Sequence, residues 1–352
     1  MLRRDVLKGL GAAAALCLGG QGASAAAAAS QLIPYGAAVQ DGPLREEADY
    51  RAALIEHCQL LVGEGGLKWF DVRPTPDQFV FDQPDRLIAF AAENGMRMRG
   101  HTLDWYAAMP DWALAIRGEH DAERELTRHI ETVVGRYRGR VPSWDVVNEP
   151  IAENPGAAAP MRDSVWQAAL GDRHVDLALL TASRVDPSAQ LVINEYDIEM
   201  HDRAHRRKRE ALLNLVKDLK DRDIPLHAVG FQGHLRGGME IDKEGVAAFV
   251  AELAGMDVDV LVTEMDVIDK QLPGPDHERD EAVAALANDF LTAIGDGGRP
   301  TAIVTWGISD AHTWVPIWFS RDDGRPNRPL PLDAGYRPKA LMRVIDGFRR
   351  QT

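Results

Sequence analysis

The chain has 352 residues, of which 45% are hydrophobic and 27% are charged, so it can bury a large core and is not an intrinsically disordered chain. Acidic residues outnumber basic ones by 54 to 40, and the net charge of −14 argues against nucleic acid or an anionic membrane surface as the main partner. Two cysteines are too few for a disulfide framework.

Residues 1–25 have the pattern of an export signal. A basic start that contains Arg3 and Arg4 precedes the apolar run Leu10–Leu18, and small residues close the segment. The arginine pair resembles the twin-arginine signal, which implies that the folded protein is exported to the periplasm or secreted. Because the apolar run is far shorter than the roughly 20 residues that span a bilayer, we expect no membrane association after processing. Residues 26–352 then form the mature chain.

The mature chain alternates short apolar runs with longer segments of helical period. The short runs are rich in Val, Ile and Leu without clean alternation, as in strands that are buried on both faces. We predict strands at Tyr35–Gln40, Leu60–Glu64, Met96–Leu103, Ser143–Asn148, Gln190–Tyr196, Ala228–Leu235, Asp259–Val267 and Ala302–Ser309. We predict helices at Arg45–Cys58, Asp85–Asn94, Ala122–Gly135, Ser164–Arg184, Arg203–Arg222, Lys243–Leu253, Glu278–Ile294 and Pro338–Phe348. Eight strand-then-helix units without a Pro/Gly/Ser-rich linker predict a single-domain (β/α)8 TIM barrel over residues 26–352.

In a TIM barrel the active residues come from the carboxyl ends of the strands and from the loops that follow them. Polar and aromatic side chains gather at these positions along the whole chain. They are Glu64, Lys68, His101, Trp105, Asn148, Glu149, Asn194, Tyr196, Gln232, His234, Glu264, Asp266, Trp306 and Trp314. We therefore expect these side chains to form one site at the barrel mouth.

Two of these residues, Glu149 and Glu264, follow strands that we expect to lie across the barrel from one another. Two opposed carboxyl groups, one protonated and one ionised, are the minimum equipment for glycoside cleavage. Asp266 could orient His234, which would in turn hold Glu264 ionised. Asn148 could bind a sugar hydroxyl beside the reacting carbon, and tryptophan faces suit the flat apolar faces of pyranose rings.

Patterns of other enzyme classes are weaker. His201 and His205 stand one helical turn apart, but the segment lacks the glutamate of a zinc-protease motif and runs into a basic stretch, so we interpret it as a solvated helix start. The chain also lacks a Walker A motif, a Gly-x-Ser-x-Gly motif and a Cys-x-x-Cys pair. The sequence therefore predicts neither a metal site nor a cofactor.

The motifs around the strand ends resemble glycoside hydrolase family 10, the β-1,4-xylanases of clan A. Recurring stretches of that family are present as Lys68-Trp69, Arg99–Trp105, Trp144–Pro150, Asn194–Tyr196, Gly230–Leu235, Thr263–Asp266 and Thr305–Asp310. The resemblance covers essentially the whole mature chain, to Ala340. Taken together the motifs are highly specific, although Asn-Glu-Pro alone also fits other families of clan A.

The resemblance implies a retaining endo-1,4-β-xylanase that acts on xylan and xylo-oligosaccharides. Glu149 would be the general acid/base and Glu264 the nucleophile, supported by His234, Asp266 and Asn148, while the other residues at the strand ends bind sugars. We expect a monomer without a nucleic-acid partner. Two alternatives stay open: a clan A β-1,4-glucanase or mixed xylanase/cellobiohydrolase, and a catalytically inactive glycan-binding barrel.

One stretch departs from the family pattern. Where the family usually has Glu-Asn-Glu-Met before Lys-Trp, this chain has Glu64-Gly65-Gly66-Leu67. The asparagine that Gly65 replaces normally hydrogen-bonds the sugar one unit beyond the cleaved ring, so we expect a weakened or reshaped subsite. A further hypothesis concerns Arg321, Arg325 and Arg328, which could contact acidic substituents of xylan or lie in a solvated loop.

Overall fold

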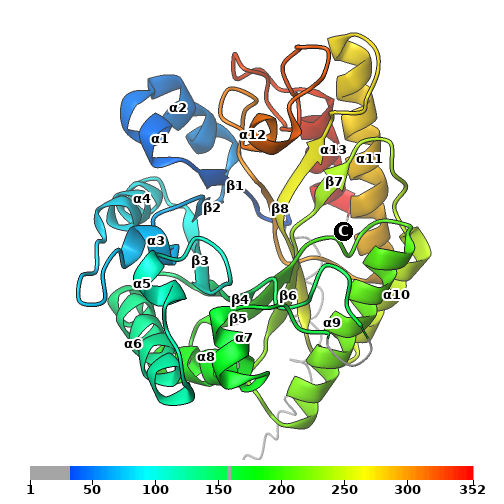
Figure 1. Ribbon diagram of the computed structural model, residues 1–352. Helices are drawn as coiled ribbons and strands as arrows, with labels where there is room; N and C mark the ends of the chain where they lie inside the picture. Colours follow the sequence, from blue (N-terminus) through cyan, green and yellow to red (C-terminus); the bar gives the residue numbers. More distant parts are fainter. Residues whose placement is uncertain (1–31, 157–159, 352) are drawn as a thin grey trace, which may run out of the picture. The chain divides into compact units, whose positions relative to one another are not determined.

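The computed structural model describes residues 32–156 and 160–351, and Ile33–Thr352 form one compact unit. The predicted export signal lies outside the described residues. The centre of the unit is a ring of eight parallel strands (Figure 1): β1 (Tyr35–Val39), β2 (Leu60–Gly63), β3 (Arg97–Asp104), β4 (Ser143–Asn148), β5 (Gln190–Glu195), β6 (Ala228–Phe231), β8 (Asp259–Ile268) and β9 (Ile303–Thr305). Each strand pairs with the next in this list and β9 pairs with β1, so the sheet closes and the predicted TIM barrel is confirmed.

One predicted strand was wrong in its extent. The run Ala228–Leu235 is divided at Gly233, whose φ of +74° turns the chain, into β6 and a short strand β7 (His234–Arg236). β7 pairs with the far end of β8, so that His234 lies opposite Asp266. This division matters for the site because it places an imidazole beside a carboxylate.

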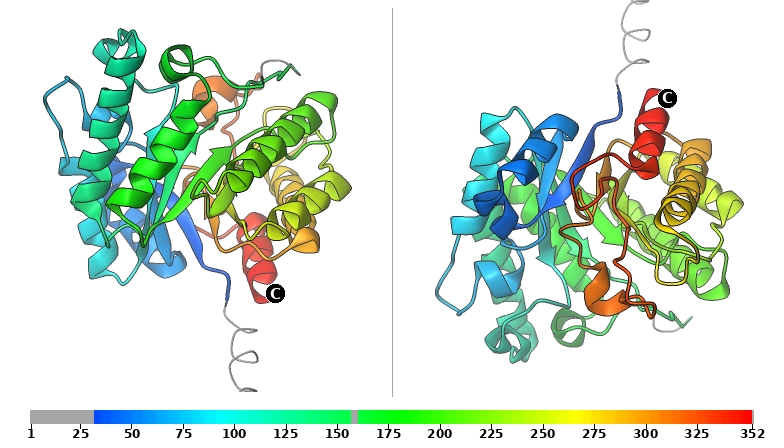
Figure 2. Two further views of the ribbon diagram at one scale, coloured as in Figure 1. Left: turned by 90° about the horizontal axis from the view of Figure 1, so that it is seen from below. Right: turned by 90° about the horizontal axis from the view of Figure 1, so that it is seen from above.

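Helices surround the barrel (Figures 1 and 2). They are α1 (Asp41–Glu46), α2 (Ala48–His57), α3 (Trp69–Val72), α4 (Asp82–Glu93), α5 (Asp111–Leu114), α6 (Glu119–Tyr137), α7 (Val165–Leu170), α8 (Arg173–Val185), α9 (Arg203–Asp221), α10 (Lys243–Ala254), α11 (Asp276–Gly297), α12 (Val315–Phe319) and α13 (Ala340–Gln351). The predicted helix Arg45–Cys58 covers the end of α1 and all of α2. The predicted helix Ser164–Arg184 covers α7 and most of α8, which are separated at Gly171, where φ is +58°. The short helices α3, α5 and α12 were not predicted, because a single turn carries no periodic signal. No helix in the described ranges is both long and apolar enough to cross a membrane.

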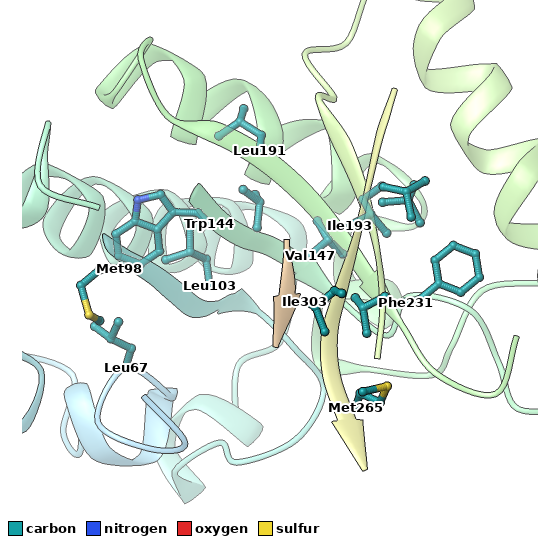
Figure 3. Close-up of a cluster of buried hydrophobic side chains, with 14 of the residues drawn as sticks. Leu67, Met98, Leu103, Trp144, Val147, Leu191, Ile193, Phe231, Met265 and Ile303 are labelled. Carbon is teal, nitrogen blue, oxygen red and sulfur yellow. The ribbon is translucent and has the colours of Figure 1, made fainter. Parts of the chain in front are cut away.

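Two layers of apolar side chains stabilise the barrel. The inner layer consists of residues on the inward face of the strands, together with Trp306: Ala38, Leu60, Val62, Val192, Ala228, Leu261, Ala302 and Val304. The outer layer lies between strands and helices and includes Leu191, Ile193, Phe231 and Ile303 (Figure 3). Because successive side chains of a strand point to opposite faces, each strand contributes to both layers, which explains the unbroken apolar runs of the sequence.

Candidate active site

A cleft of about 720 Å³ lies at the carboxyl ends of the barrel strands. Most of the predicted site residues line it: Glu64, Lys68, His101, Trp105, Glu149, Tyr196, Gln232, His234, Glu264, Trp306 and Trp314. The other three, Asn148, Asn194 and Asp266, are buried behind this lining and are hydrogen-bonded to it. The structure thus brings the whole predicted set together, while the roles of the individual residues stay predictions.

Glu149 is the first residue after β4. Its φ of +56° turns the chain away from the sheet, and its backbone N–H donates to the carbonyl oxygen of Asn194 at 2.7 Å. Three side-chain N–H groups hold the carboxyl group: Trp105 Nε1 at 3.0 Å, Asn148 Nδ2 at 3.1 Å and Gln232 Nε2 at 3.0 Å. Because Glu149 is only 8% exposed and has three donors, its carboxyl group is held in one orientation at the cleft.

Glu264 lies in β8, across the barrel from β4. Its carboxylate accepts a hydrogen bond from Asn194 Nδ2 at 2.7 Å, and His234 Nε2 and His101 Nδ1 lie 3.3 Å and 3.9 Å from its oxygens. Burial on its own raises the pKa of Glu264, but the hydrogen bond from His234 and the nearby imidazoles outweigh burial, so this pKa lies below its ordinary value. The surroundings therefore favour the ionised carboxylate, which is the form that a nucleophile requires.

Two side-chain amides connect the carboxyl groups. Asn194 Nδ2 donates to Asn148 Oδ1 at 2.8 Å as well as to Glu264, and Asn148 Nδ2 donates to Glu149. Thr263 Oγ1 donates to Asn194 Oδ1 at 2.6 Å. This bond fixes the orientation of the amide, so that its Nδ2 faces Glu264. Since these amides are buried on neighbouring strands, they set the relative positions of the two carboxyl groups.

The imidazole of His234 lies between two carboxylates. Its Nδ1 is 3.0 Å from Asp266 Oδ1, and its Nε2 faces Glu264. Burial lowers the pKa of His234, but the charge of Asp266 and its hydrogen bonds to Asp266 and Glu264 outweigh burial, so the pKa is raised well above its ordinary value. The surroundings of His234 therefore favour the protonated imidazolium. Asp266 is fixed in turn by Trp314 Nε1, which donates to its Oδ2 at 2.7 Å.

Aromatic rings and a cation form one part of the cleft lining. Lys68 Nζ lies 5.1 Å from the ring centre of Trp105 and 5.7 Å from that of Trp306. His101 packs edge-on against Trp306, with ring centres 5.1 Å apart, and its Nδ1 is 3.0 Å from Asp145 Oδ2. These contacts hold flat apolar faces and polar groups side by side, as recognition of a sugar requires.

Glu64 and Tyr196 follow β2 and β5, on opposite sides of the barrel. Burial raises the pKa of Glu64, although its hydrogen bond to Gln40 and the charge of Lys68 act in the other direction. Tyr196 Oη accepts a hydrogen bond from Arg162 Nη2 at 2.8 Å, and burial raises its pKa as well. The protonated, uncharged form of both groups is therefore favoured more strongly than it would be in water.

Sequence reasoning missed residues that support the site from behind. Arg162 Nε donates to the carbonyl oxygen of Glu149 at 2.9 Å, in addition to its bond to Tyr196. Asp145 is buried in β4 and holds His101. A charge within an apolar strand is a signal that could have identified Asp145, whereas Arg162 lies in a loop without any pattern.

A buried carboxyl group, Glu199, was also missed. Glu199 is 1% exposed and accepts the backbone N–H groups of Ile198 at 2.8 Å and Gly233 at 3.1 Å. Gly233 separates Gln232 from His234, the two residues that contact the carboxyl groups of the site. Glu199 therefore supports the turn between β6 and β7.

Replacement of Glu199 by glutamine is expected to flatten the dependence of stability on pH between about pH 5 and 7. Burial and the charge of Asp197 raise the pKa of Glu199 to about 7, from an ordinary value of 4.5. The folded protein binds this proton more tightly than the unfolded chain, so the contribution is fully present below the unfolded pKa. It is lost as the pH rises towards 7, at about 1.4 kcal/mol per pH unit.

Urea unfolding at about pH 5 and at about pH 7 tests this prediction. Glutamine does not titrate, so the free energy of unfolding of Glu199→Gln should change less between the two pH values than that of the wild type. Glu240→Gln is the matched control, because the side chain of Glu240 is exposed. Equal changes in the wild type and in Glu199→Gln would contradict the assignment.

A closed parallel barrel with two opposed carboxyl groups in a tryptophan-lined cleft defines the site of a barrel-type glycoside hydrolase. Within residues 32–156 and 160–351, no group of three or more His, Cys, Asp or Glu side chains is placed to hold a metal ion. A sequence model described as "Glycosyl hydrolase family 10" matches residues 23–347, and the chain belongs to this family. The resemblance inferred from the motifs is thus confirmed.

Two curated relatives of the chain are named as xylanases. It is 34% identical to a β-1,4-xylanase of Dictyoglomus thermophilum over 307 residues, which is 85% of this chain and 84% of the relative. It is 31% identical to endo-1,4-β-xylanase B of Paenibacillus barcinonensis, over 92% and 97% of the two chains. The structure of xylanase 10B from Thermotoga petrophila in complex with xylobiose superimposes with a TM-score of 0.80 at 28% identity, over 90% and 94% of the chains.

Proposed function

We propose that the protein is an endo-1,4-β-xylanase that hydrolyses internal β-1,4-xylosidic bonds of xylan with retention of configuration. The observation that carries this proposal is the pair formed by Glu149 and Glu264. The two carboxyl groups come from opposite sides of the barrel, are joined through amides, and have different surroundings: N–H donors hold one, and an imidazolium keeps the other ionised. The names of the two curated relatives described above agree in the substrate.

In the first step, protonated Glu149 gives its proton to the glycosidic oxygen while Glu264 attacks C1 of the sugar. The bond between C1 and the leaving oxygen breaks, and a bond between C1 and a Glu264 oxygen forms. The result is a covalent glycosyl-enzyme and a released sugar chain. His234 orients the attacking carboxylate, because its ring is itself fixed by Asp266.

In the second step, Glu149 is a carboxylate and takes a proton from a water molecule. The water oxygen attacks C1 from the side that the leaving group occupied, and Glu264 departs as a carboxylate. Two inversions at C1 give net retention. Glu149 returns to its protonated form, so the enzyme is ready for another turnover.

The direct test is hydrolysis of unsubstituted β-1,4-xylan beside carboxymethyl-cellulose, with NMR detection of the anomer that is released first. We expect cleavage of xylan and initial release of the β-anomer. Cleavage of cellulose alone would refute the substrate and support the glucanase alternative. A folded protein without activity on either polymer would refute the enzymatic function.

Replacement of His234 by glutamine is expected to move the acidic limb of the pH–activity profile to higher pH. The imidazolium lowers the pKa of Glu264, so its removal leaves the nucleophile protonated over a wider range on the acidic side. We expect kcat/KM for an aryl β-xylobioside to fall by about a hundredfold at acidic pH, where both loss of charge and loss of orientation act. His201→Gln, at a half-exposed histidine, should keep the wild-type profile. An unmoved acidic limb in His234→Gln would contradict the role of the imidazolium.

Gly65→Asn is expected to lower KM for short xylo-oligosaccharides by about three- to tenfold with little change in kcat. This decrease in KM corresponds to the free energy of one regained hydrogen bond. A Cβ atom at Gly65 would lie 3.0 Å from Asp71 Oδ2, which accepts the N–H of Gly66 at 2.9 Å. That carboxylate lies at the end of a flexible side chain and can shift by a few tenths of an ångström. Gly65→Ala introduces the same contact without the amide and should leave KM unchanged. An unchanged KM in Gly65→Asn would refute the weakened subsite.

We also propose that residues 1–25 direct export of the folded protein to the periplasm or the exterior. The proposal rests on the pair Arg3-Arg4 before the apolar run Leu10–Leu18. Replacement of both arginines by lysine should retain the active protein in the cytoplasm of a bacterial host. Export that is unaffected by this change would refute the twin-arginine route.

A further inference from the structure

The cleft carries an aromatic ring that the mechanism does not use. Trp318, in α12, lines the same cleft as Glu149 and Glu264, and 75% of its surface is exposed. The other cleft tryptophans are engaged with the protein: the indole N–H groups of Trp105 and Trp314 donate to carboxylates of the site, and Trp306 is buried. A large exposed ring that adjoins a binding cleft is a candidate contact for ligand.

The segment that presents Trp318 is anchored at its carboxyl end. The ring of Phe319 packs edge-on against Trp314, with centres 5.7 Å apart. Asn327 Nδ2 donates to the carbonyl oxygen of Phe319 at 3.2 Å and to Oδ1 of Asp269 at 2.7 Å, and Asp269 is fully buried. The backbone of α12 is therefore held in place, so that only the side-chain torsions of Trp318 remain to be ordered on binding.

The arginines of this segment are occupied by the protein itself. Arg321 binds Asp323, Arg325 donates to the carbonyl oxygen of Gly274 at 2.7 Å, and Arg328 Nε donates to Asp280 at 2.8 Å. These hydrogen bonds stabilise the loop and occupy the guanidinium groups that an acidic substituent would have to bind. The hypothesis of a basic site for such substituents therefore loses its support.

Two further charged residues of the cleft lining, Arg236 and Glu153, do not favour an anionic ligand. Arg236 lines this cleft, but both oxygens of Asp197 accept hydrogen bonds from its Nη2, at 3.0 Å and 2.9 Å. Glu153, a further lining residue, has a side chain that is 67% exposed. A carboxylate and a neutralised arginine give an anionic sugar no net attraction here.

We propose that Trp318 is an additional sugar-binding platform, whose indole face stacks on a neutral sugar ring farther from the cleaved bond than the rings held at Trp105, Trp306 and Trp314. This inference rests on the proposed xylanase function and extends its binding site. The ring belongs either to a distant unit of the xylan backbone or to a neutral sugar substituent, and both offer C–H groups to an indole face.

The test compares Trp318→Ala with Ile317→Ala. Ile317 is 72% exposed on the same helix but does not line the cleft, so it controls for loss of exposed apolar surface. For Trp318→Ala we expect kcat/KM to fall about tenfold on a substrate that reaches the platform and to stay unchanged on an aryl β-xylobioside. Trp318→Phe should recover part of the loss, because it keeps an aromatic face.

The substrates distinguish the two sources of the ring. A loss on xylohexaose and linear xylan assigns the platform to a backbone unit, and a loss confined to arabinoxylan assigns it to a substituent. Equal kcat/KM for Trp318→Ala and the wild type on all substrates would overturn the proposal, as would an equal loss on the aryl xylobioside or in Ile317→Ala. Wild-type activity on linear xylan reports the proposed function separately, since its absence would refute that function whatever Trp318 does.

Discussion

Replacement of Glu264 by alanine is expected to lower kcat for xylan on the order of 10⁵-fold, because the reaction loses the atom that bonds to C1. Glu264 is 4% exposed and accepts hydrogen bonds from neighbouring side chains, so alanine leaves a polar cavity beside C1 rather than a new nucleophile. Initial rates on xylan and on an aryl β-xylobioside measure the loss. Circular dichroism spectra that match the wild type serve as the control for folding.

Azide identifies the role of Glu264 more specifically than the loss of rate. In Glu264→Ala a small anion can enter the vacated space and attack C1 from the same side as the missing carboxylate. Azide should therefore restore turnover of an activated aryl xylobioside and yield the α-xylobiosyl azide. A β-azide product, or residual activity within about tenfold of the wild type, would contradict the assignment of Glu264 as nucleophile.

The second large effect is expected for Glu149→Ala, and its size depends on the leaving group. Loss of a general acid costs about 10²- to 10⁴-fold when the leaving oxygen needs a proton, as in xylan. A dinitrophenolate leaves without protonation, so formation of the glycosyl-enzyme from a dinitrophenyl xylobioside should stay close to the wild-type rate. Its hydrolysis then becomes slow, because no base activates the water.

A burst of dinitrophenolate followed by a slow steady state is the measurement for Glu149→Ala. Azide should speed the slow phase and give the β-xylobiosyl azide, since it attacks the glycosyl-enzyme from the side opposite Glu264. Gln232→Ala removes one donor to the same carboxyl group and should show no such dependence on the leaving group. Equal losses on xylan and on the dinitrophenyl substrate would contradict an acid/base role for Glu149.

The barrel and the membership of the site could be predicted from the sequence for physical reasons. Strands covered on both faces need apolar residues at every position, so runs such as Gln190–Tyr196 stand out between helical segments. The carboxyl ends of these strands meet at one mouth, which places Glu149 and Glu264 together without knowledge of any contact. Both predictions follow from periodicity and position within the barrel.

Features that depend on turns and loops could not be predicted in this way. The turn at Gly233, which follows Gln232, separates β6 from β7, which begins at His234. A glycine in an apolar run is compatible with a turn, a bulge or a continuous strand, so the sequence alone does not predict this break. Trp318 lies in the short helix α12, which carries no periodic signal from which its exposure could be predicted. Glu199 is polar and lies between elements, so only the folded chain shows that it is buried under the turn.

The most direct test of the account is to trap the covalent intermediate with a 2-deoxy-2-fluoro-β-xylobioside that carries a dinitrophenyl leaving group. The fluorine slows both steps, while the good leaving group keeps the first step faster than the second, so the glycosyl-enzyme accumulates. Mass spectrometry should then find one fluoroxylobiosyl group per chain, attached to the peptide that contains Glu264. A label on Glu149, or time-dependent inactivation without a covalent label, would contradict the proposed mechanism.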